Sequence, residues 1–313
     1  MKILFIDTTH PSLHEELVKA GFQCHLNFNL TTEQIIQDID QYEGVIIRSK
    51  IKFTREIIDR ALRLKFIARV GAGMENIDVS YAESKGISCL HAPEGNRDAV
   101  AEHALGMLLS LLNNIGRADK EVRAGKWIRE GNRGVELAGK TIGVIGFGNM
   151  GSAFAQRLKC FGCEVIAYDK YKKGFGSEHV KEVGLTDIFK RTDVLSLHLP
   201  LTDETNYLIN DTFINKFAKP FYIINTARGK ILNTADLVKN MRSGKVLGTC
   251  LDVLEYETIS FEDIDTKVLP EPFQYLIRSD KVILTPHIAG WTHESNEKMA
   301  RVLVNKIKML YNL

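Results

Sequence analysis

The stretch Gly146-Phe147-Gly148-Asn149-Met150-Gly151, read together with the apolar run 141–145 before it, decides the fold of this 313-residue chain. It has the spacing G-x-G-x-x-G between a predicted strand and a helix predicted over 151–161. In such a unit, glycines permit a tight turn and a close backbone approach to a pyrophosphate, and the helix N-terminus stabilises the phosphate charge. We therefore expect Gly146, Gly148, Asn149, Met150 and Gly151 to bind a dinucleotide.

Asp169 ends the next predicted strand, 18 residues after Gly151. An acid at this place can hydrogen-bond the ribose hydroxyls and repels a 2′-phosphate. The sequence therefore favours NAD over NADP as the cofactor. Lys170, Lys172 and Lys173 follow closely and weaken that preference.

Strands and helices alternate along the whole chain, which predicts an α/β protein with doubly wound parallel sheets. Predicted strands in the first third cover 3–6, 45–47, 66–68 and 87–90. Those of the second series cover 141–145, 165–168, 194–197, 222–224, 248–251 and 282–284. Predicted helices include 54–61, 77–84, 99–118 and 294–310. Because the glycine stretch begins only at residue 146, a region the size of a domain precedes it.

Composition excludes several classes of protein. Hydrophobic residues make up 44% and charged residues 26%, which is ordinary for a soluble globular protein. With 41 basic and 39 acidic residues, the net charge of +2 argues against a nucleic-acid partner bound by charge alone. No run approaches the roughly 20 apolar residues of a membrane span, and the first apolar run stops at Asp7, too early for a signal peptide. We expect a cytoplasmic protein with no membrane partner.

Cysteine and histidine usage predicts no metal site. Cys160 and Cys163 have C-x-x-C spacing, which is compatible with redox chemistry or half a zinc site, but no second pair follows. We expect them to be buried cysteines at a junction between a helix and a strand. The chain has nine histidines but no H-E-x-x-H motif.

Several stretches together resemble the signature blocks of the D-isomer-specific 2-hydroxyacid dehydrogenases. These stretches are 69–78, 92–96, 100–103, 198–202, 225–229, 251–257 and 285–290. The resemblance implies a Rossmann NAD-binding domain, residues 97–286, inserted into a flavodoxin-like substrate domain of residues 1–96 and 287–313. It also implies a substrate cleft between the domains and a homodimer paired through the cofactor domains.

The resemblance implies a catalytic set of Arg228, Glu257 and His287, and the residue types suit the chemistry. A 2-hydroxy acid needs a cation for its carboxylate, and the planar guanidinium of Arg228 fits one. His287 follows a predicted strand and can move a proton in either direction near neutral pH. Glu257 would orient His287; Glu255 is the alternative acid, but the family pattern selects the position five residues beyond Asp252.

The resemblance also implies further contacts with the cofactor and the substrate. Asp252 would meet the nicotinamide carboxamide, and Thr226, Ala227 and Gly290 would lie near the same part of the cofactor. His198 would line the cofactor cleft, although a structural histidine at a strand end is an equal alternative. The substrate loop would contain Gly71, Ala72 and Gly73. We expect His103, on the long helix, to be packed or solvated rather than catalytic.

Two features depart from the family pattern. Thr258 replaces a proline that often follows the acid, and the stretch from Glu257 to His287 is longer than usual, which predicts an enlarged loop over the site. Trp291 stands where a small residue is often found.

Arg48 and Ser49 give the one indication of substrate. They follow the strand predicted over 45–47 and resemble the arginine–serine step with which D-3-phosphoglycerate dehydrogenases hold a phosphate. The best expectation is oxidation of D-3-phosphoglycerate to 3-phosphohydroxypyruvate, in serine biosynthesis, by a short form without a C-terminal regulatory domain. The sequence is equally compatible with Arg48 being an exposed arginine of a loop with no substrate role. The alternatives are a hydroxypyruvate/glyoxylate reductase, a D-lactate-type dehydrogenase or an NAD-sensing corepressor-like binding protein.

Overall fold

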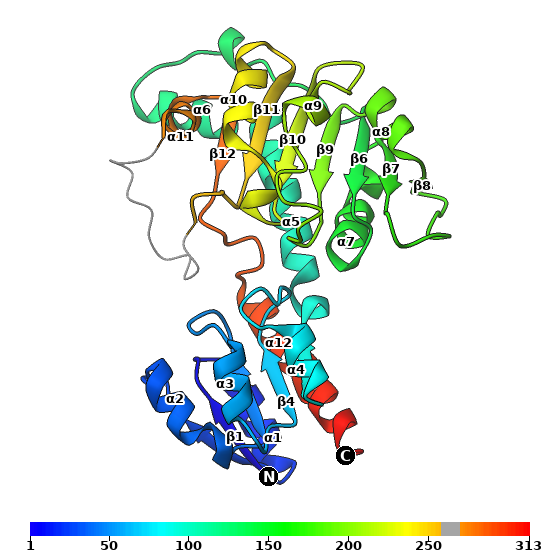
Figure 1. The fold of residues 1–313 in the computed structure, drawn as a ribbon. Helices are drawn as coiled ribbons and strands as arrows, with labels where there is room; N and C mark the ends of the chain where they lie inside the picture. Colours follow the sequence, from blue (N-terminus) through cyan, green and yellow to red (C-terminus); the bar gives the residue numbers. More distant parts are fainter. Residues whose placement is uncertain (258–269) are drawn as a thin grey trace. The chain divides into compact units, whose positions relative to one another are not determined.

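The computed structural model describes residues 1–257 and 270–313, which form two compact units. The first unit contains residues 1–97 and 291–313, and the second contains residues 98–290 (Figure 1). His287 therefore belongs to the second unit. Each unit is built around its own parallel sheet.

The first unit has a five-stranded parallel sheet in the order β2-β1-β3-β4-β5. Its strands are β1 (Lys2–Phe5), β2 (Gln23–Leu26), β3 (Gly44–Ile47), β4 (Phe66–Arg69) and β5 (Ser88–His91). Its helices are α1 (Pro11–Lys19), α2 (Thr32–Asp38), α3 (Arg55–Arg60), α4 (Val79–Ser84) and α12 (His293–Leu310), with a 3-10 turn η1 (Ile39–Gln41). Figure 1 shows α12, in orange to red, beside these N-terminal elements.

Apolar residues on alternate positions of β1 explain why both faces of this sheet are covered. Leu4 belongs to the hydrophobic cluster that includes Ile35 and Ile57, from α2 and α3. Ile3 and Phe5 belong to a second cluster, which contains side chains of α1 and α12. Since successive side chains of a strand point to opposite faces, the sheet lies between two helical layers.

The second unit has a seven-stranded parallel sheet in the order β12-β11-β10-β9-β6-β7-β8. Its strands are β6 (Thr141–Ile145), β7 (Glu164–Tyr168), β8 (Lys181–Glu182), β9 (Val194–Leu197), β10 (Phe221–Asn225), β11 (Val246–Leu251) and β12 (Val282–Leu284). Figure 1 shows the arrows of β9, β6 and β7 running in one direction. The chain builds the sheet outward from β6 first to one side and then to the other, so the strand order reverses between β6 and β9. Ligands of such folds bind at this switch point, and the predicted fold class is confirmed.

Helices and short turns connect these strands. The helices are α7 (Asn149–Arg157), α8 (Leu185–Arg191), α9 (Asp211–Ile214), α10 (Thr234–Arg242) and α11 (Glu271–Arg278). The 3-10 turns are η2 (Glu130–Asn132), η3 (Leu158–Cys160) and η4 (Gly229–Ile231). No described helix has both the length and the apolar character required to cross a membrane.

Two expectations from the sequence are wrong. The helix expected over 99–118 is instead two helices, α5 (Pro93–Leu112) and α6 (Ile115–Arg123). They are separated at Asn114, whose left-handed φ of 54° interrupts the helical hydrogen bonds and which an asparagine tolerates. Cys160 is exposed rather than buried, because it ends the η3 turn before the chain enters β7. Cys163 is half-buried rather than fully buried.

Candidate active site

The predicted site residues of the second unit follow the carboxyl ends of six neighbouring strands. In the order of the sheet they are His287 after β12, Asp252 and Glu257 after β11, Arg228 after β10, His198 after β9, Gly146 after β6 and Asp169 after β7. Because the strands are parallel, all these ends lie along one edge of the sheet.

The glycine turn after β6 uses its three glycines for different purposes. Gly146 has a left-handed φ of 90°, and a Cβ there would lie 2.3 Å from the carbonyl oxygen of His198. A Cβ on Gly151 would lie 2.0 Å from the carbonyl oxygen of Gly146. A Cβ on Gly148 would meet no atom within 4 Å. Gly146 and Gly151 are therefore required by the local fold, and Gly148 leaves open space for a ligand to approach the backbone.

Asp169 fixes the far side of this turn. Its carboxylate accepts hydrogen bonds from the backbone N–H groups of Phe147 at 2.8 Å and of Tyr171 and Lys172 at 2.9 Å. Burial alone would raise the pKa of Asp169, but these N–H donors and the charge of Lys172 outweigh it and hold the pKa below its usual range. The group is consequently a carboxylate at neutral pH, as an acid facing ribose hydroxyls must be.

The turn that presents Arg228 is shaped by Asn225, the fully buried last residue of β10. Its side-chain oxygen accepts from the N–H of Ala227 at 3.1 Å, and its amide donates to the carbonyl of Arg228 at 3.0 Å. A Cβ on Gly229 would lie 2.0 Å from the carbonyl of Leu254, so glycine allows this turn to approach the segment that leads to Glu257. The backbone that carries Arg228 is therefore held from two sides.

His287 and Glu257 form a direct pair. The ring Nδ1 of His287 lies 2.8 Å from Oε2 of Glu257, whose other oxygen accepts from the N–H of Leu254. His287 has a left-handed φ of 55°, an unusual conformation for a residue with a side chain. Its N–H donates to the carbonyl of Asp252 at 2.8 Å, which helps to hold it there.

Glu255, the alternative acid, is engaged elsewhere. Its Oε1 accepts from the N–H of Thr234 at 2.9 Å, at the start of α10. The structure therefore brings Glu257, and not Glu255, to His287.

Asp252 holds the segment that contains His287. Its side chain is 1% exposed and accepts from the N–H groups of Ile288 and Ala289, each at 2.9 Å, and from the hydroxyl of Thr285 at 2.5 Å. His103 Nε2 lies 3.0 Å from that hydroxyl and 3.6 Å from Asp252 Oδ1. The resemblance gave Asp252 a cofactor contact only, and sequence reasoning missed the position of His103, since no local pattern joins residues 182 positions apart.

His198 lies beside the glycine turn as a neutral ring. Its Nε2 is 2.8 Å from the hydroxyl of Ser196, and its ring contacts that of Phe154 at a centroid distance of 5.5 Å. Burial lowers the pKa of His198 to about 4, because the charged form would lose its hydration.

The predicted substrate residues of the first unit also follow strand ends. Arg48 and Ser49 follow β3, and the loop Gly71-Ala72-Gly73 comes shortly after β4. The N–H of Arg48 donates to Asp7 Oδ2 at 2.5 Å, and its carbonyl accepts from Asn76 at 2.9 Å. A ring nitrogen of His91 lies 2.7 Å from the carbonyl of Ala72, beneath the glycine loop.

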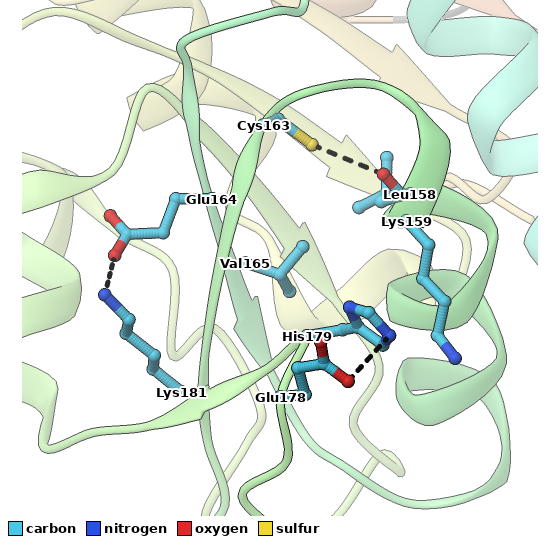
Figure 2. Close-up of a pocket in the computed structure, with 8 residues that line it drawn as sticks. All are labelled: Leu158, Lys159, Cys163, Glu164, Val165, Glu178, His179 and Lys181. Atoms are coloured by element: carbon cyan, nitrogen blue, oxygen red, sulfur yellow. Dashed lines mark hydrogen bonds and ion pairs between the residues drawn. The ribbon is translucent and has the colours of Figure 1, made fainter.

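A pocket away from these residues lies at the opposite end of β7 (Figure 2). Glu164 and Val165, at the start of that strand, contribute to its lining. Among its lining residues, Nζ of Lys181 lies 2.7 Å from Glu164 and Nε2 of His179 lies 3.8 Å from Glu178. None of the predicted site residues lines it. Within residues 1–257 and 270–313, no cluster of three or more metal-ligating side chains occurs.

Comparisons with known proteins agree with this arrangement. The family model described as "D-isomer specific 2-hydroxyacid dehydrogenase, NAD binding domain" matches residues 105–289. The chain belongs to this family. It is 34% identical over 309 residues to a D-3-phosphoglycerate dehydrogenase of Archaeoglobus fulgidus, covering 98% of this chain and 56% of that protein. It is 38% identical to a hydroxypyruvate reductase of Thermotoga maritima, covering 89% of this chain and 88% of that protein.

A solved structure extends the comparison to the fold. The D-lactate dehydrogenase of Aquifex aeolicus, complexed with NAD and lactic acid, has a TM-score of 0.83 to this chain at 29% identity. The structural match covers 100% of this chain and 96% of the D-lactate dehydrogenase chain. The chain thus spans about half the length of the phosphoglycerate dehydrogenase it matches, and nearly the whole of the D-lactate dehydrogenase.

The matching family model is that of an NAD-binding domain, and solved structures similar to this chain contain NAD, so the expected cofactor is confirmed. The residues present fit NAD. The open space at Gly148 leaves room for the expected pyrophosphate, and the lowered pKa of Asp169 suits the acid expected to face the ribose hydroxyls. The hydroxyl of Thr226 is buried and has no hydrogen-bond partner in the described part of the chain, which suits a group that hydrogen-bonds to a bound ligand. The enlarged loop expected after Glu257, with Thr258, lies largely outside the described residues.

Proposed function

We propose that this protein interconverts a D-2-hydroxy acid and the corresponding 2-oxo acid with NAD, and that Arg228, Glu257 and His287 act on the substrate. The observation that carries the proposal is the 2.8 Å pair of His287, which follows β12, and Glu257, which follows β11, the strand beside the β10 strand that Arg228 follows. A general acid oriented by a carboxylate, near a cation, is what this reaction needs.

Each residue has a separate task during reduction of the oxo acid. When bound, NADH supplies a hydride to C2 of the substrate. His287 donates a proton to the carbonyl oxygen through Nε2, because Nδ1 is engaged by Glu257. Glu257 stabilises the imidazolium before transfer, and Arg228 binds the substrate carboxylate.

Two matched substitutions test the assignment of the acid. Glu257→Gln should lower kcat roughly tenfold with little change in the KM for NADH, since a charge-assisted hydrogen bond to His287 is lost. Glu255→Gln is the control, because that side chain bonds to the start of α10 instead. A larger loss of kcat in the control would show that the wrong acid had been assigned.

The proposed substrate carries a phosphate, as D-3-phosphoglycerate and 3-phosphohydroxypyruvate do. Arg48 and Ser49 supply a guanidinium and a hydroxyl, which suit a dianion. The Archaeoglobus fulgidus relative is named for this activity, and serine biosynthesis would use it. The second candidate is a hydroxypyruvate reductase, favoured by the Thermotoga maritima relative, of which the chain covers 88%.

Turnover of a substrate panel separates these candidates. We would measure kcat/KM with NADH for 3-phosphohydroxypyruvate, hydroxypyruvate, glyoxylate and pyruvate in the wild type and in Arg48→Ala. The phosphorylated acid should be preferred, and Arg48→Ala should lower its kcat/KM by roughly tenfold to a hundredfold while sparing the others. A wild type without that preference, or equal losses on all acids, would contradict the phosphoglycerate assignment. NADH binding without turnover of any acid would favour the corepressor-like alternative.

A homodimer in the cytoplasm completes the proposal. Helix α6 buries none of its side chains, and its Ile115 and Val122 are each about half exposed. Trp127 and Ile128, shortly after it, are also exposed. Exposed apolar side chains in this region, although α6 is otherwise largely charged, would suit pairing with a second copy. Sedimentation of the wild type and of Val122→Asp would test it, with a shift towards monomer expected in the variant.

A further inference from the structure

Trp291 lies against the substrate residue Arg48 in the first unit. The guanidinium carbon of Arg48 is 4.5 Å from the centroid of the Trp291 ring, within the range of a cation–π contact. The Trp291 side chain is 69% exposed, so burial in a core does not explain the presence of a tryptophan. One face of the indole therefore has a specific neighbour, although most of the side chain is open to solvent.

Arg48 is held in place by its backbone. Its N–H donates to Asp7, and its carbonyl accepts from Asn76 at 2.9 Å and from Nε of Arg69 at 3.0 Å. Its side chain is partly withdrawn from water, and this desolvation lowers the pKa of Arg48, although the negative charge of Asp7 opposes the shift. A cation is thus kept at a fixed strand end with part of its hydration removed.

The guanidinium has unused hydrogen-bonding capacity. Across residues 1–257 and 270–313, its N–H groups make no hydrogen bond to a protein acceptor, although a guanidinium has five donors. The indole contact is not a hydrogen bond, so it leaves these donors available to a ligand. A planar set of donors with a fixed orientation is what an oxyanion with two or three oxygens binds.

We propose that Trp291 is a specificity-determining residue, whose indole holds the Arg48 guanidinium in the orientation that binds a second anionic group of the substrate. The preferred substrates are then 2-hydroxy acids with a distal phosphate or a similar dianion, over those with an uncharged end. This inference rests on the proposed function, because it requires Arg48 to meet the substrate. Trp291 acts through Arg48 and is a positioning residue.

Substitutions that retain or remove the aromatic face test this role. In Trp291→Leu, which keeps apolar bulk but no π face, kcat/KM for 3-phosphohydroxypyruvate should fall roughly threefold to thirtyfold, mainly through KM. Trp291→Phe should recover most of that loss, because a weaker aromatic platform remains. For hydroxypyruvate all variants should stay within about twofold of the wild type. Since the side chain is largely exposed, thermal unfolding midpoints should be unchanged; Trp291→Ala replaces the leucine variant if that one does not fold.

The double variant Arg48→Ala/Trp291→Leu supplies the decisive comparison. In the Arg48→Ala background, loss of the indole should have no further effect on either substrate, since the group it positions is gone. A Trp291→Leu effect that persists in that background, or that is equal for both substrates, would overturn the inference. The proposed function would still stand if Arg48→Ala impairs only the phosphorylated substrate. If Arg48→Ala alone weakens both substrates equally, the phosphorylated-substrate proposal fails, and this inference fails with it.

Discussion

The glycine turn after β6 and the segment 285–290 after β12 are held in their backbone conformations by different means. Both leave strands of the same sheet and both carry residues proposed to meet the cofactor or the substrate. The turn is shaped by missing side chains, because Gly146 and Gly151 each lie where a Cβ would collide with a carbonyl oxygen. The segment is shaped by a buried carboxylate, since Asp252 accepts hydrogen bonds from Thr285, Ile288 and Ala289.

We expect this difference to separate residues that bind the cofactor from residues that take part in proton transfer. The turn has no room for a side chain at Gly146 or Gly151, and none of its glycines is titratable. A segment held by hydrogen bonds can keep His287 in a left-handed conformation and present its ring to Glu257. We therefore expect changes in the turn to affect cofactor affinity, and changes in the segment to affect turnover.

The largest effect should come from the segment. His287→Ala removes the proposed acid, and kcat should fall by roughly 10²-fold to 10⁴-fold. NADH affinity, followed by fluorescence, should stay close to that of the wild type, because the glycine turn is untouched. His179→Ala, at an exposed histidine of the same unit, is the control. Near-normal turnover in His287→Ala would remove this residue from the mechanism and with it the functional contrast between the two regions.

The sequence predicted these two regions unequally. The glycine turn has a local signature, because Gly146, Gly148 and Gly151 lie in one strand–turn–helix unit with the spacing G-x-G-x-x-G. Asp252 and its hydrogen-bond partners are brought together only by the fold, so the sequence alone did not indicate that Asp252 holds the segment 285–290. His103 is the clearest case: as one polar residue on a mostly apolar helix it resembles any solvated histidine.

Strand positions could be predicted from composition, whereas the break between α5 and α6 could not. Strands of parallel sheets are rich in apolar residues, and the predicted ranges 141–145, 194–197 and 282–284 coincide with β6, β9 and β12. The break at Asn114 depends on a single left-handed residue between two helical patterns, which periodicity does not detect. The cation–π contact of Arg48 with Trp291 joins the two sequence segments of the first unit, and no spacing rule predicts it.

The second effect concerns the edge of the glycine turn, where His198 is held neutral. Its pKa of about 4 in the folded protein lies below the ordinary 6.5, so the unfolded chain binds more protons between these pH values. Stability contributed by the neutral ring is therefore present above pH 6.5 and is lost as the pH falls towards 4. Between pH 7 and pH 5 the loss should be about 2 kcal/mol.

Urea unfolding at these two pH values measures that loss. In His198→Gln, which keeps a polar side chain near Ser196 but cannot titrate, the unfolding free energy should fall by about 2 kcal/mol less than in the wild type. An identical pH dependence in both proteins would mean that the His198 ring is not kept neutral by the fold.

The third effect separates the two kinds of glycine within the turn. Gly151→Ala places a Cβ 2.0 Å from a carbonyl oxygen, so we expect a loss of roughly 1–3 kcal/mol in stability as well as weaker NADH binding. Gly148→Ala meets no protein atom within 4 Å, so its thermal midpoint should be unchanged while NADH affinity falls roughly tenfold. Full NADH affinity in Gly148→Ala would show that the pyrophosphate does not approach the backbone there.

The smallest effect tests whether the turn also selects between NAD and NADP. Asp169 is held ionised by three backbone N–H donors, so a 2′-phosphate at the ribose would face a full negative charge. Asp169→Ala should weaken NAD binding and reduce the ratio of the Kd for NADP to that for NAD by roughly fivefold to tenfold. Asp169→Asn separates the two parts of this effect, because it keeps an acceptor for the N–H of Phe147 but removes the charge. If charge decides the selection, the asparagine variant should relax the ratio as far as the alanine variant does, while retaining more of the thermal stability. An unchanged ratio in both variants would mean that Asp169 shapes the turn, as Asp252 shapes the segment after β12, and does not read the ribose.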